Sequence, residues 1–396
     1  MTPSPSTPPA AIVGVGFIGQ AHIEALRRLN VPIAGVLGHE EGYTRREAAR
    51  LSLRPYLSLD DLLADPQVAV VHQCGPNDVH SAQNLLALAA GKHVFSEKPL
   101  GTTPLETRRQ LEFARASKLQ HAVHFTYRGY PMVRELRERV RRGDLGEIRF
   151  IRGRYFQDWL LKEDDYNWRL EAKASETRTV GDIGSHVLDL TRYVTGLEPT
   201  RLFARFAQMH QTRFRPSGQV QTFANSSERG TPFTVQTEDQ ATLLVEYGEL
   251  VCANFEVAQV YAGHQNDLCL ELFGTEGSAR WSQENPEEIV LGHRDRPNEV
   301  LRKSALLSSE AAKMAHYPGG HPEGYPDAIL NAIRAFYASL EHQGLEQRDL
   351  EAGYATFEDG HAAALAVAAA QKSHQEGGWV RLEDFELSRQ RVGGVK

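Results

Sequence analysis

Short apolar segments alternate with amphipathic segments between residues 11 and 124. This alternation predicts βαβ units around a parallel sheet, because a parallel connection needs a crossover long enough to contain a helix. With residues 1–10 set aside as a proline-rich disordered tail, residues 11–127 are predicted to form a doubly wound α/β domain. The predicted strands are 11–15, 33–37, 69–73, 93–96 and 121–124, and the predicted helices are 19–29, 43–51, a short one at 58–65, 78–90 and 104–117.

The pattern changes after residue 128, where strand-like segments become the majority. Several of them are separated only by short turns such as Tyr247-Gly248-Glu249, which indicates antiparallel strands. We therefore predict that residues 128–396 form an α+β domain with a large, mostly antiparallel sheet. Its predicted helices are 131–142, 184–194, about 323–342 and about 356–374, and its predicted strands include 241–247, 250–256 and 268–273.

Two segments of this second half have no clear place in the pattern. The last helix, at about 356–374, could pack back on the first domain. The polar segment 210–237 is interpreted as a long connection or arm, and its sequence does not indicate a role.

Composition narrows the classes of function. No stretch approaches the ~20 apolar residues of a membrane span, and a net charge of −7 with dispersed Lys and Arg disfavours nucleic acid as a partner. The leader has neither a basic region nor an apolar core, so it is not interpreted as a secretory signal. Cys74, Cys252 and Cys269 fit no metal-ligand or disulfide spacing, which favours free thiols in the cytoplasm.

A glycine-rich loop follows the first predicted strand directly. Gly14, Gly16 and Gly19 enclose Phe17 and Ile18 and lead into the first helix. In that context the first glycine permits a tight turn, the second lets the backbone approach a pyrophosphate, and the third lets helix pack on strand. The loop therefore predicts a dinucleotide site, although a turn that is merely glycine-rich is the alternative.

The end of the second strand bears on the choice of cofactor. An acidic residue that binds the ribose of NAD is expected there, but the chain has Gly38-His39. A 2′-phosphate would meet no repulsion, and Arg45 or Arg46 could pair with it. Alternatively, both arginines are solvated helix residues and Glu40 or Glu41 serves NAD. We favour NADP and keep NAD open.

Two further loops lie at the carboxyl ends of predicted strands, where ligands of open α/β sheets bind. The first contains Cys74, Pro76, Asn77 and His80, and the second is Glu97-Lys98-Pro99. We expect both to face the cofactor. Lys98 is placed to donate to a reacting oxygen, and its alternative is an ordinary surface lysine.

A third constellation precedes the helix at 184–194. Asp182 is expected at the helix entrance, with His186 in the first turn and Asp189 three residues later on nearly the same face. An imidazole with a pKa near ~6.5 suits a general base that removes a hydroxyl proton at neutral pH. The alternative is that Asp182 caps the helix and His186 is a core histidine.

Taken in order, Gly14-x-Gly16-x-x-Gly19, Pro76-Asn77-x-x-His80, Glu97-Lys98-Pro99 and Asp182-x-x-x-His186 resemble the Gfo/Idh/MocA family of oxidoreductases. The likeness covers nearly the whole chain. It implies a Rossmann domain followed by a domain whose open sheet often forms an oligomer interface, so a homo-oligomer is expected. It also implies that Lys98, Asp182 and His186 are catalytic, with His186 as the acid/base.

The segments 155–161 and 166–169 are similar to a subgroup that includes levoglucosan-dehydrogenase-like sugar oxidoreductases. Aromatic rings stack on pyranose faces while polar groups meet hydroxyls, although the two tryptophans could instead be core anchors. The candidate substrate residues are Lys98, Arg128, Tyr155, Trp159, Trp168, Arg169, Asp182, His186 and His321.

The resulting hypothesis is an NAD(P)-dependent enzyme that transfers a hydride between nicotinamide and a secondary alcohol or ketone of a sugar or cyclitol. No metal is expected, because a base and a lysine serve this chemistry and no two histidines have helical ligand spacing there. The alternatives are a cofactor-binding regulator without catalysis and an NAD-dependent glycoside hydrolase.

Overall fold

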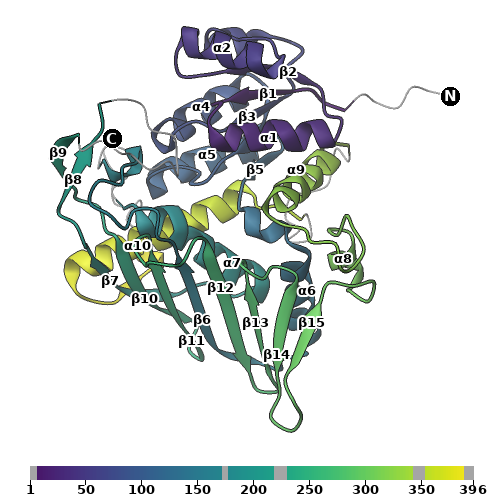
Figure 1. Ribbon diagram of the computed structural model, residues 1–396, viewed down its shortest axis with the longest axis vertical. Coiled ribbons are helices and arrows are strands. Elements are labelled where there is room, and N and C mark those ends of the chain that lie inside the picture. Colours follow the sequence, from purple (N-terminus) through teal and green to yellow (C-terminus); the bar gives the residue numbers. More distant parts are fainter. Residues whose placement is uncertain (1–6, 172–176, 218–229, 342–352, 388–396) are drawn as a thin grey trace. The chain divides into compact units, whose positions relative to one another are not determined.

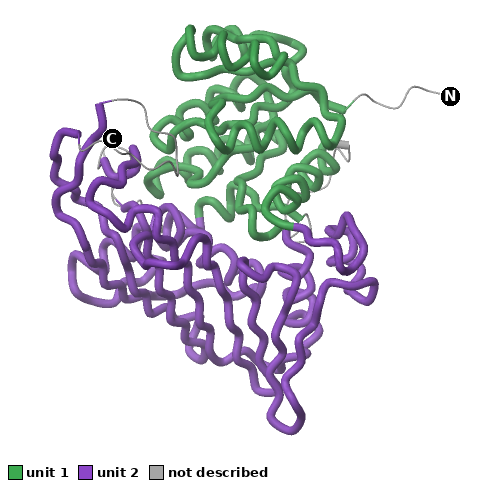
Figure 2. Tube along the Cα trace, in the orientation of Figure 1, with its two compact units in different colours: residues 1–129, 324–361 green, residues 130–323, 362–396 purple. Residues whose placement is uncertain are grey.

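The computed structural model describes residues 7–171, 177–217, 230–341 and 353–387. Residues 1–6 of the predicted tail lie outside this range. The chain divides into two compact units, shown in different colours in Figure 2. Unit 1 comprises residues 1–129 and 324–361, and unit 2 comprises residues 130–323 and 362–396.

Unit 1 contains a five-stranded parallel sheet in the order β2-β1-β3-β4-β5 (Figure 1), which confirms the predicted doubly wound fold. Its central strands are buried because helices cover both faces. The strand order reverses between β1 and β3, where such sheets bind ligands. The strands are β1 (Ala10–Val13), β2 (Ile33–Leu37), β3 (Val70–Gln73), β4 (His93–Ser96) and β5 (His121–Val123), and the helices are α1 (Phe17–Arg28), α2 (Glu41–Leu51), α3 (Leu59–Ala64), α4 (Asn77–Ala89) and α5 (Pro104–Ser117).

Local capping explains why two of these helices begin where they do. The Ser58 hydroxyl accepts from the Asp61 amide at the start of α3. Thr103 and Glu106 form a reciprocal capping box at α5, and Pro104 occupies its first turn. These contacts satisfy amides that have no partner within the helix, so short polar signals define the boundaries.

A late helix belongs to the core of unit 1, which the predicted division at residue 127 did not include. Helix α9 (Tyr325–Glu341) presents Ile329, Ile333 and Phe336 to the same apolar cluster as Ile12 of β1 and Phe95 of β4. Burial of this apolar stripe brings the segment back to the first domain. The first five residues of α10 (Phe357–Glu376) also belong to unit 1.

Unit 2 is built on a nine-stranded sheet in the order β15-β14-β13-β12-β6-β11-β10-β7-β16. Its pairings are antiparallel except for the parallel pair β6 and β11, as expected for the α+β domain. Helices α6 and α7 pack along one face (Figure 1). The elements are α6 (Pro131–Arg142), β6 (Ile148–Phe156), α7 (Ser185–Thr195), β7 (Arg201–Ala207), β10 (Gln240–Tyr247), β11 (Val251–Ala258), β12 (Asp267–Gly274), β13 (Ser278–Ser282), β14 (Glu288–Gly292), β15 (Glu299–Arg302), α8 (Ser309–Ala312), β16 (Val380–Arg381) and α11 (Glu383–Leu387).

The segment predicted as an irregular arm at 210–237 contains regular structure at both ends. Strands β8 (Thr212–Arg215) and β9 (Thr231–Thr234) pair antiparallel, and residues 218–229 between them lie outside the described residues. The polar composition of these strands hides the pairing, because neither shows a clear apolar alternation. Within the described residues, no helix has the length and apolar character needed to cross a bilayer.

Candidate active site

The glycine loop of unit 1 has the geometry that a dinucleotide pyrophosphate requires. Gly14 adopts a φ of +92°, and a Cβ there would lie 2.4 Å from the Cys74 carbonyl oxygen. A Cβ on Gly19 would lie 2.0 Å from the Gly14 carbonyl oxygen, whereas a Cβ on Gly16 would meet nothing within 4 Å. The first and third glycines therefore permit close backbone packing, and the second leaves space before the α1 amides, where a phosphate fits.

Side chains of α2 contact the two residues that follow β2. The Gly38 amide donates to the Thr44 hydroxyl at 3.0 Å, and the ring of His39 lies 4.5 Å from that of Tyr43 between centroids. Arg45 forms an exposed ion pair with Glu41 at 2.8 Å. Neither Gly38 nor His39 supplies the carboxylate that would oppose a 2′-phosphate.

A buried histidine joins the two remaining cofactor loops. Both ring nitrogens of His80 face carbonyl oxygens, that of Pro99 at 2.7 Å and that of Gly75 at 2.8 Å. Asn77 is buried in the first turn of α4, with Pro76 preceding it. His80 thus connects the loops after β3 and β4 at the carboxyl ends of these strands.

Glu97, the residue before Lys98, ends a chain of buried hydrogen bonds. The Tyr337 hydroxyl lies 3.2 Å from His72 Nε2, and His72 Nδ1 lies 3.0 Å from His22 Nδ1. His22 Nε2 donates to Glu97 Oε1 at 3.1 Å. The tautomers that satisfy each contact have Tyr337 donating to His72, His72 to His22, and His22 to Glu97.

A second branch reaches the same carboxylate from β5. His124 Nδ1 donates to Glu97 Oε1 at 2.5 Å, and His124 Nε2 lies 2.9 Å from the Thr126 hydroxyl. The other oxygen of Glu97 accepts from the Lys98 amide at 3.2 Å. The two branches therefore converge on one carboxylate that also bonds the backbone of the candidate catalytic lysine.

Burial and hydrogen bonding determine the charge of Glu97, His22 and His72, which together with His124 form the buried histidine cluster. Burial lowers the pKa of both His22 and His72, so both rings are neutral. Burial raises the pKa of Glu97, but His124 and His22 outweigh this effect and hold it well below its usual range. An ionised Glu97 that accepts from His22 and His124 gives both of these contacts one donor and one acceptor.

Three residues of the cluster are of types that bind metals. Among the described residues, His22, Glu97 and His124 form a group whose donor atoms all lie within 4.8 Å of one another. Two ligands of one tetrahedral zinc ion lie about 3.3 Å apart, given bonds of about 2.0–2.1 Å. The 2.5 Å between His124 Nδ1 and Glu97 Oε1 is instead a hydrogen-bond distance.

In unit 2, Asp182 and His186 lie about one turn apart on a continuous helix. Asp182 lies in a π-helical turn, Val180–Gly184, which continues into α7. Because helical structure begins before Asp182, its carboxylate does not cap α7. Its Oδ2 accepts from Gln259 Nε2 at 2.9 Å, and its Oδ1 lies 3.5 Å from Arg169 Nε.

Aromatic residues predicted to meet a sugar lie around this pair. The rings of Tyr155 and His186 are 6.1 Å apart between centroids. Trp159 donates from Nε1 to Gln157 Oε1 at 2.9 Å, and the Arg169 guanidinium lies 4.3 Å from the centroid of the Trp168 ring. The described structure therefore brings together Tyr155, Trp159, Trp168, Arg169, Asp182 and His186 within unit 2.

The same two halves appear in a known family. The family described as "Oxidoreductase family, NAD-binding Rossmann fold" matches residues 9–125, and the "GFO/IDH/MocA C-terminal domain" matches residues 133–280. The chain belongs to the Gfo/Idh/MocA family of NAD-binding oxidoreductases.

Individual members of the Gfo/Idh/MocA family are similar over most of the chain. Levoglucosan dehydrogenase from Pseudarthrobacter phenanthrenivorans is 27% identical over 295 residues, which are 71% of this chain and 75% of that protein. A solved structure of levoglucosan dehydrogenase in complex with NADH and L-sorbose has a TM-score of 0.84 at 22% identity, and 94% of this chain and 98% of that chain are covered.

A second solved structure, an inositol dehydrogenase homolog from Azotobacter vinelandii with NADH and myo-inositol, has a TM-score of 0.82. It is 24% identical, with 94% of this chain and 97% of that chain covered. At these identities the structural likeness establishes the fold.

Two candidate substrate residues have other contacts in this Gfo/Idh/MocA chain. Arg128 is 2% exposed and pairs with Asp359 at 2.9 Å within unit 1, so its charge stabilises the start of α10. His321 is exposed, and its carbonyl accepts from Lys303 at 2.8 Å. A substrate role for either residue stays a prediction.

Sequence reasoning did not identify Gln259 or the buried histidine cluster. Gln259 is a single buried polar residue directly after β11, and His22, His72 and His124 are buried on α1, on β3 and directly after β5. Isolated polar residues of this kind could have indicated a buried polar network. The sequence does not identify their partners, which lie up to 265 residues away in the chain.

The neutral state of His22 and His72 predicts acid-sensitive stability. Because the folded pKa values of His22 and His72 are lowered, unfolding takes up protons, and stability decreases as pH falls below about 6.5, the unfolded histidine value. A His72→Phe variant should show a smaller slope of unfolding free energy against pH, by up to one proton or about 1.4 kcal/mol per pH unit. Urea unfolding between pH 5 and 8 measures both slopes; equal slopes would contradict the assignment.

Proposed function

We propose that this chain oxidises a secondary hydroxyl of a sugar or cyclitol, or reduces the corresponding ketone, with a nicotinamide dinucleotide as hydride carrier. The observation that carries the proposal is the position of Asp182 and His186 about one turn apart on one helical segment, with Arg169 3.5 Å from Asp182 and Trp159 linked to Asp182 through Gln157 and Gln259. Together these supply a base, polar groups and an aromatic face for a polyhydroxylated substrate. The names of similar proteins, levoglucosan dehydrogenase and inositol dehydrogenase homolog, support the same class of substrate.

The residues divide the chemistry among them. His186 takes the hydroxyl proton while the carbon loses its hydride, and it returns a proton to the oxygen in the reverse direction. Lys98 donates a hydrogen bond to the reacting oxygen as charge develops there. Asp182, held by Gln259, accepts from a substrate hydroxyl or orients the imidazole. When bound, NAD(P)⁺ supplies the hydride acceptor at its nicotinamide carbon.

For the cofactor, we propose that the site accepts NADP(H) in addition to NAD(H). Gly38 and His39 contribute no carboxylate that would repel a 2′-phosphate. Arg46 lies near the Tyr43 ring, 5.9 Å from its centroid, on the helix that follows. A guanidinium there could pair with a phosphate, because Arg forms bidentate charge-assisted hydrogen bonds.

We also propose a cytoplasmic homo-oligomer. Phe150, Leu244 and Phe273 are each about two-fifths exposed on strands β6, β10 and β12. An apolar strip on a sheet face suits association with a second copy. The three cysteines are free thiols, which suits a reducing compartment.

Removal of the proposed catalytic groups should reduce turnover and leave cofactor binding intact. In His186→Asn, Asp182→Asn and Lys98→Met, kcat/KM for the best sugar should fall ~10²–10⁴-fold, because each variant loses proton transfer or transition-state stabilisation. NADH affinity, followed by fluorescence, should stay within a few-fold for His186→Asn and Asp182→Asn. Lys313→Met, a surface substitution in unit 2, is the matched control.

A panel of monosaccharides, anhydrosugars and inositols, assayed by absorbance of the reduced ring, tests the reaction itself. Tight cofactor binding without turnover of any of them would favour a non-catalytic regulator. Release of an aglycone from a glycoside would instead identify a hydrolase that uses bound NAD.

A carboxylate introduced at the end of β2 should change the ratio of NADPH affinity to NADH affinity. His39→Asp should weaken NADPH binding by ~10-fold or more, because the acid repels the 2′-phosphate, and should leave NADH binding equal or stronger. Arg46→Ala is the companion variant, and it should weaken NADPH alone. Fluorescence titrations with both cofactors measure the ratio, and an unchanged ratio in both variants would rule out a 2′-phosphate site here.

A charge on the exposed sheet face should prevent assembly. Phe150→Glu is expected to convert the oligomer to a monomer, because a carboxylate in an apolar interface is left without a partner. Leu250→Glu, in the turn between β10 and β11, is the control and should keep the native mass. Size-exclusion chromatography with light scattering distinguishes the two; a monomeric wild-type chain would contradict the proposal.

A further inference from the structure

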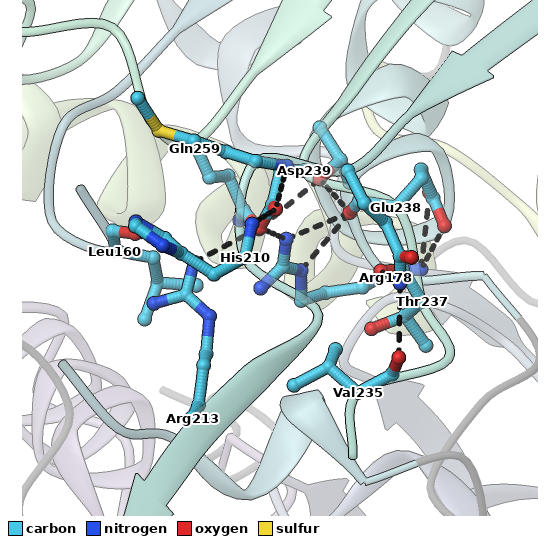
Figure 3. Close-up of polar contacts among 12 residues, drawn as sticks. Leu160, Arg178, His210, Arg213, Val235, Thr237, Glu238, Asp239 and Gln259 are labelled. Carbon is cyan, nitrogen blue, oxygen red and sulfur yellow. Dashed lines mark hydrogen bonds and ion pairs between the residues drawn. The ribbon is translucent and has the colours of Figure 1, made fainter. Parts of the chain in front are cut away.

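Two adjacent carboxylates, Glu238 and Asp239, precede β10 and accept hydrogen bonds from two separate segments, residues 178–180 and 209–213 (Figure 3). Asp239 Oδ1 accepts from Arg178 and, at 3.0 Å, from Arg213. Its Oδ2 accepts from the amides of Met209 at 2.6 Å and His210 at 3.2 Å. The side chain of Asp239 is 1% exposed, and those of both arginines are fully buried.

This carboxylate is ionised despite its burial. Burial raises the pKa of Asp239, but the charges of Arg178 and Arg213 outweigh it, and the net pKa is lowered. Two buried cations lower the cost of burying one anion between them when hydrogen bonds also reach the ions. The two terminal nitrogens of Arg213 donate to the backbone of the loop at 158–171.

Arg213 connects the β8–β9 hairpin to that loop. Its terminal nitrogens donate to the carbonyls of Leu160 at 2.8 Å and Lys162 at 2.7 Å. The His210 ring contacts the Leu161 carbonyl at 2.8 Å. Three successive carbonyls, immediately after Trp159, are therefore held by residues of the hairpin.

Apolar contacts strengthen the same connection. Val235, just after β9, forms a buried cluster with Leu160 and Leu170. Phe233 and Trp159 are partly buried against this cluster. The hairpin thus contacts both ends of the loop that carries Trp159, Trp168 and Arg169.

Glu238 and Asp239 also hold the turn that contains Asp182. The Glu238 carboxylate accepts from the amides of Arg178 at 3.1 Å and Val180 at 2.8 Å. The Gln259 amide donates to the Asp239 carbonyl at 3.0 Å, while its side chain donates to Asp182. Hydrogen bonds therefore connect both the loop at 158–171 and the Asp182 turn to Glu238 and Asp239.

We propose that Arg213 is a positioning residue that, through Asp239, fixes the loop at 158–171 relative to the Asp182 turn and thereby determines which sugars the enzyme accepts. This inference rests on the proposed function, because it assigns the loop to substrate binding. It also gives the segment at 210–237 a role, since the described part of that segment supplies Arg213, His210 and Val235. Arg213 acts through backbone carbonyls, and its guanidinium does not need to touch the substrate.

The test compares Arg213→Met and Arg213→Lys with wild type. Arg213→Met should raise KM for the preferred sugar by ~10-fold or more and reduce its kcat/KM advantage over the next sugar by ~5-fold, with kcat changed less than KM. Arg213→Lys should partly restore both the KM and the sugar preference. An ammonium keeps the charge, but it cannot bond Leu160, Lys162 and Asp239 at the same time. NADH affinity should stay within about twofold for both.

Two further variants separate positioning from general destabilisation. Arg201→Met removes an exposed arginine that pairs with Glu246 on the same sheet, and it should change neither KM nor sugar preference. His210→Ala removes only the contact to Leu161 and should shift KM in the same direction by a smaller factor. It provides the measurement if Arg213→Met fails to fold.

Amide hydrogen exchange of residues 158–166 is the readout that does not depend on activity. Exchange there should rise in Arg213→Met and His210→Ala, with α1 of unit 1 unchanged. Unchanged exchange, or an equal loss of kcat/KM for every sugar, would overturn the inference. If wild type turns over no polyol, the proposed function and the specificity role fall together, while the exchange result alone decides whether Arg213 positions the loop.

Discussion

A carboxylate removed from water has to receive hydrogen-bond donors from the protein, and this requirement organises both units of the chain. In unit 1 the carboxylate is Glu97, which accepts from His22, His124 and the amide of Lys98. In unit 2 it is Asp239, which accepts from two arginines and two amides. Glu97 bonds the amide of Lys98 directly, and Gln259, whose backbone amide donates to the carbonyl of Asp239, donates to Asp182 from its side chain.

The two units meet this requirement in different ways. Around Glu97 the side-chain donors are histidines, and burial lowers the pKa of His22 and of its neighbour His72, so the stability that this network contributes depends on pH. Around Asp239 the donors are arginines, which stay protonated at any accessible pH. The Glu97-Lys98 loop is therefore supported by a network that contains histidines, and the loop at 158–171 by permanently charged arginines.

Members of a family with one fold act on different substrates because the variable parts are loops on a common scaffold. In this chain the proposed cofactor loops directly follow strands of the parallel sheet, and close backbone packing at Gly14 and Gly19 leaves the first of them little freedom. The loop at 158–171 belongs to no sheet, and it depends on Arg213 and the β8–β9 hairpin for its position. Specificity can then change through the hairpin without any change to Lys98, Asp182 or His186.

The sequence by itself determined the features that depend on near neighbours in the chain. Apolar periodicity predicted most helices and strands described here. Gly14, Gly16 and Gly19 predicted the turn because the strand before them and the helix after them lie within a few residues in the sequence. Ordered motifs likewise predicted the family. The position of α9 in unit 1, the pairing of β8 with β9, and the partners of Glu97, Asp182 and Asp239 were decided only by the tertiary structure. The same physical reason applies to all of them. A buried apolar stripe or a buried charge contacts the partner that folding brings next to it, and that partner can lie hundreds of residues away in the sequence.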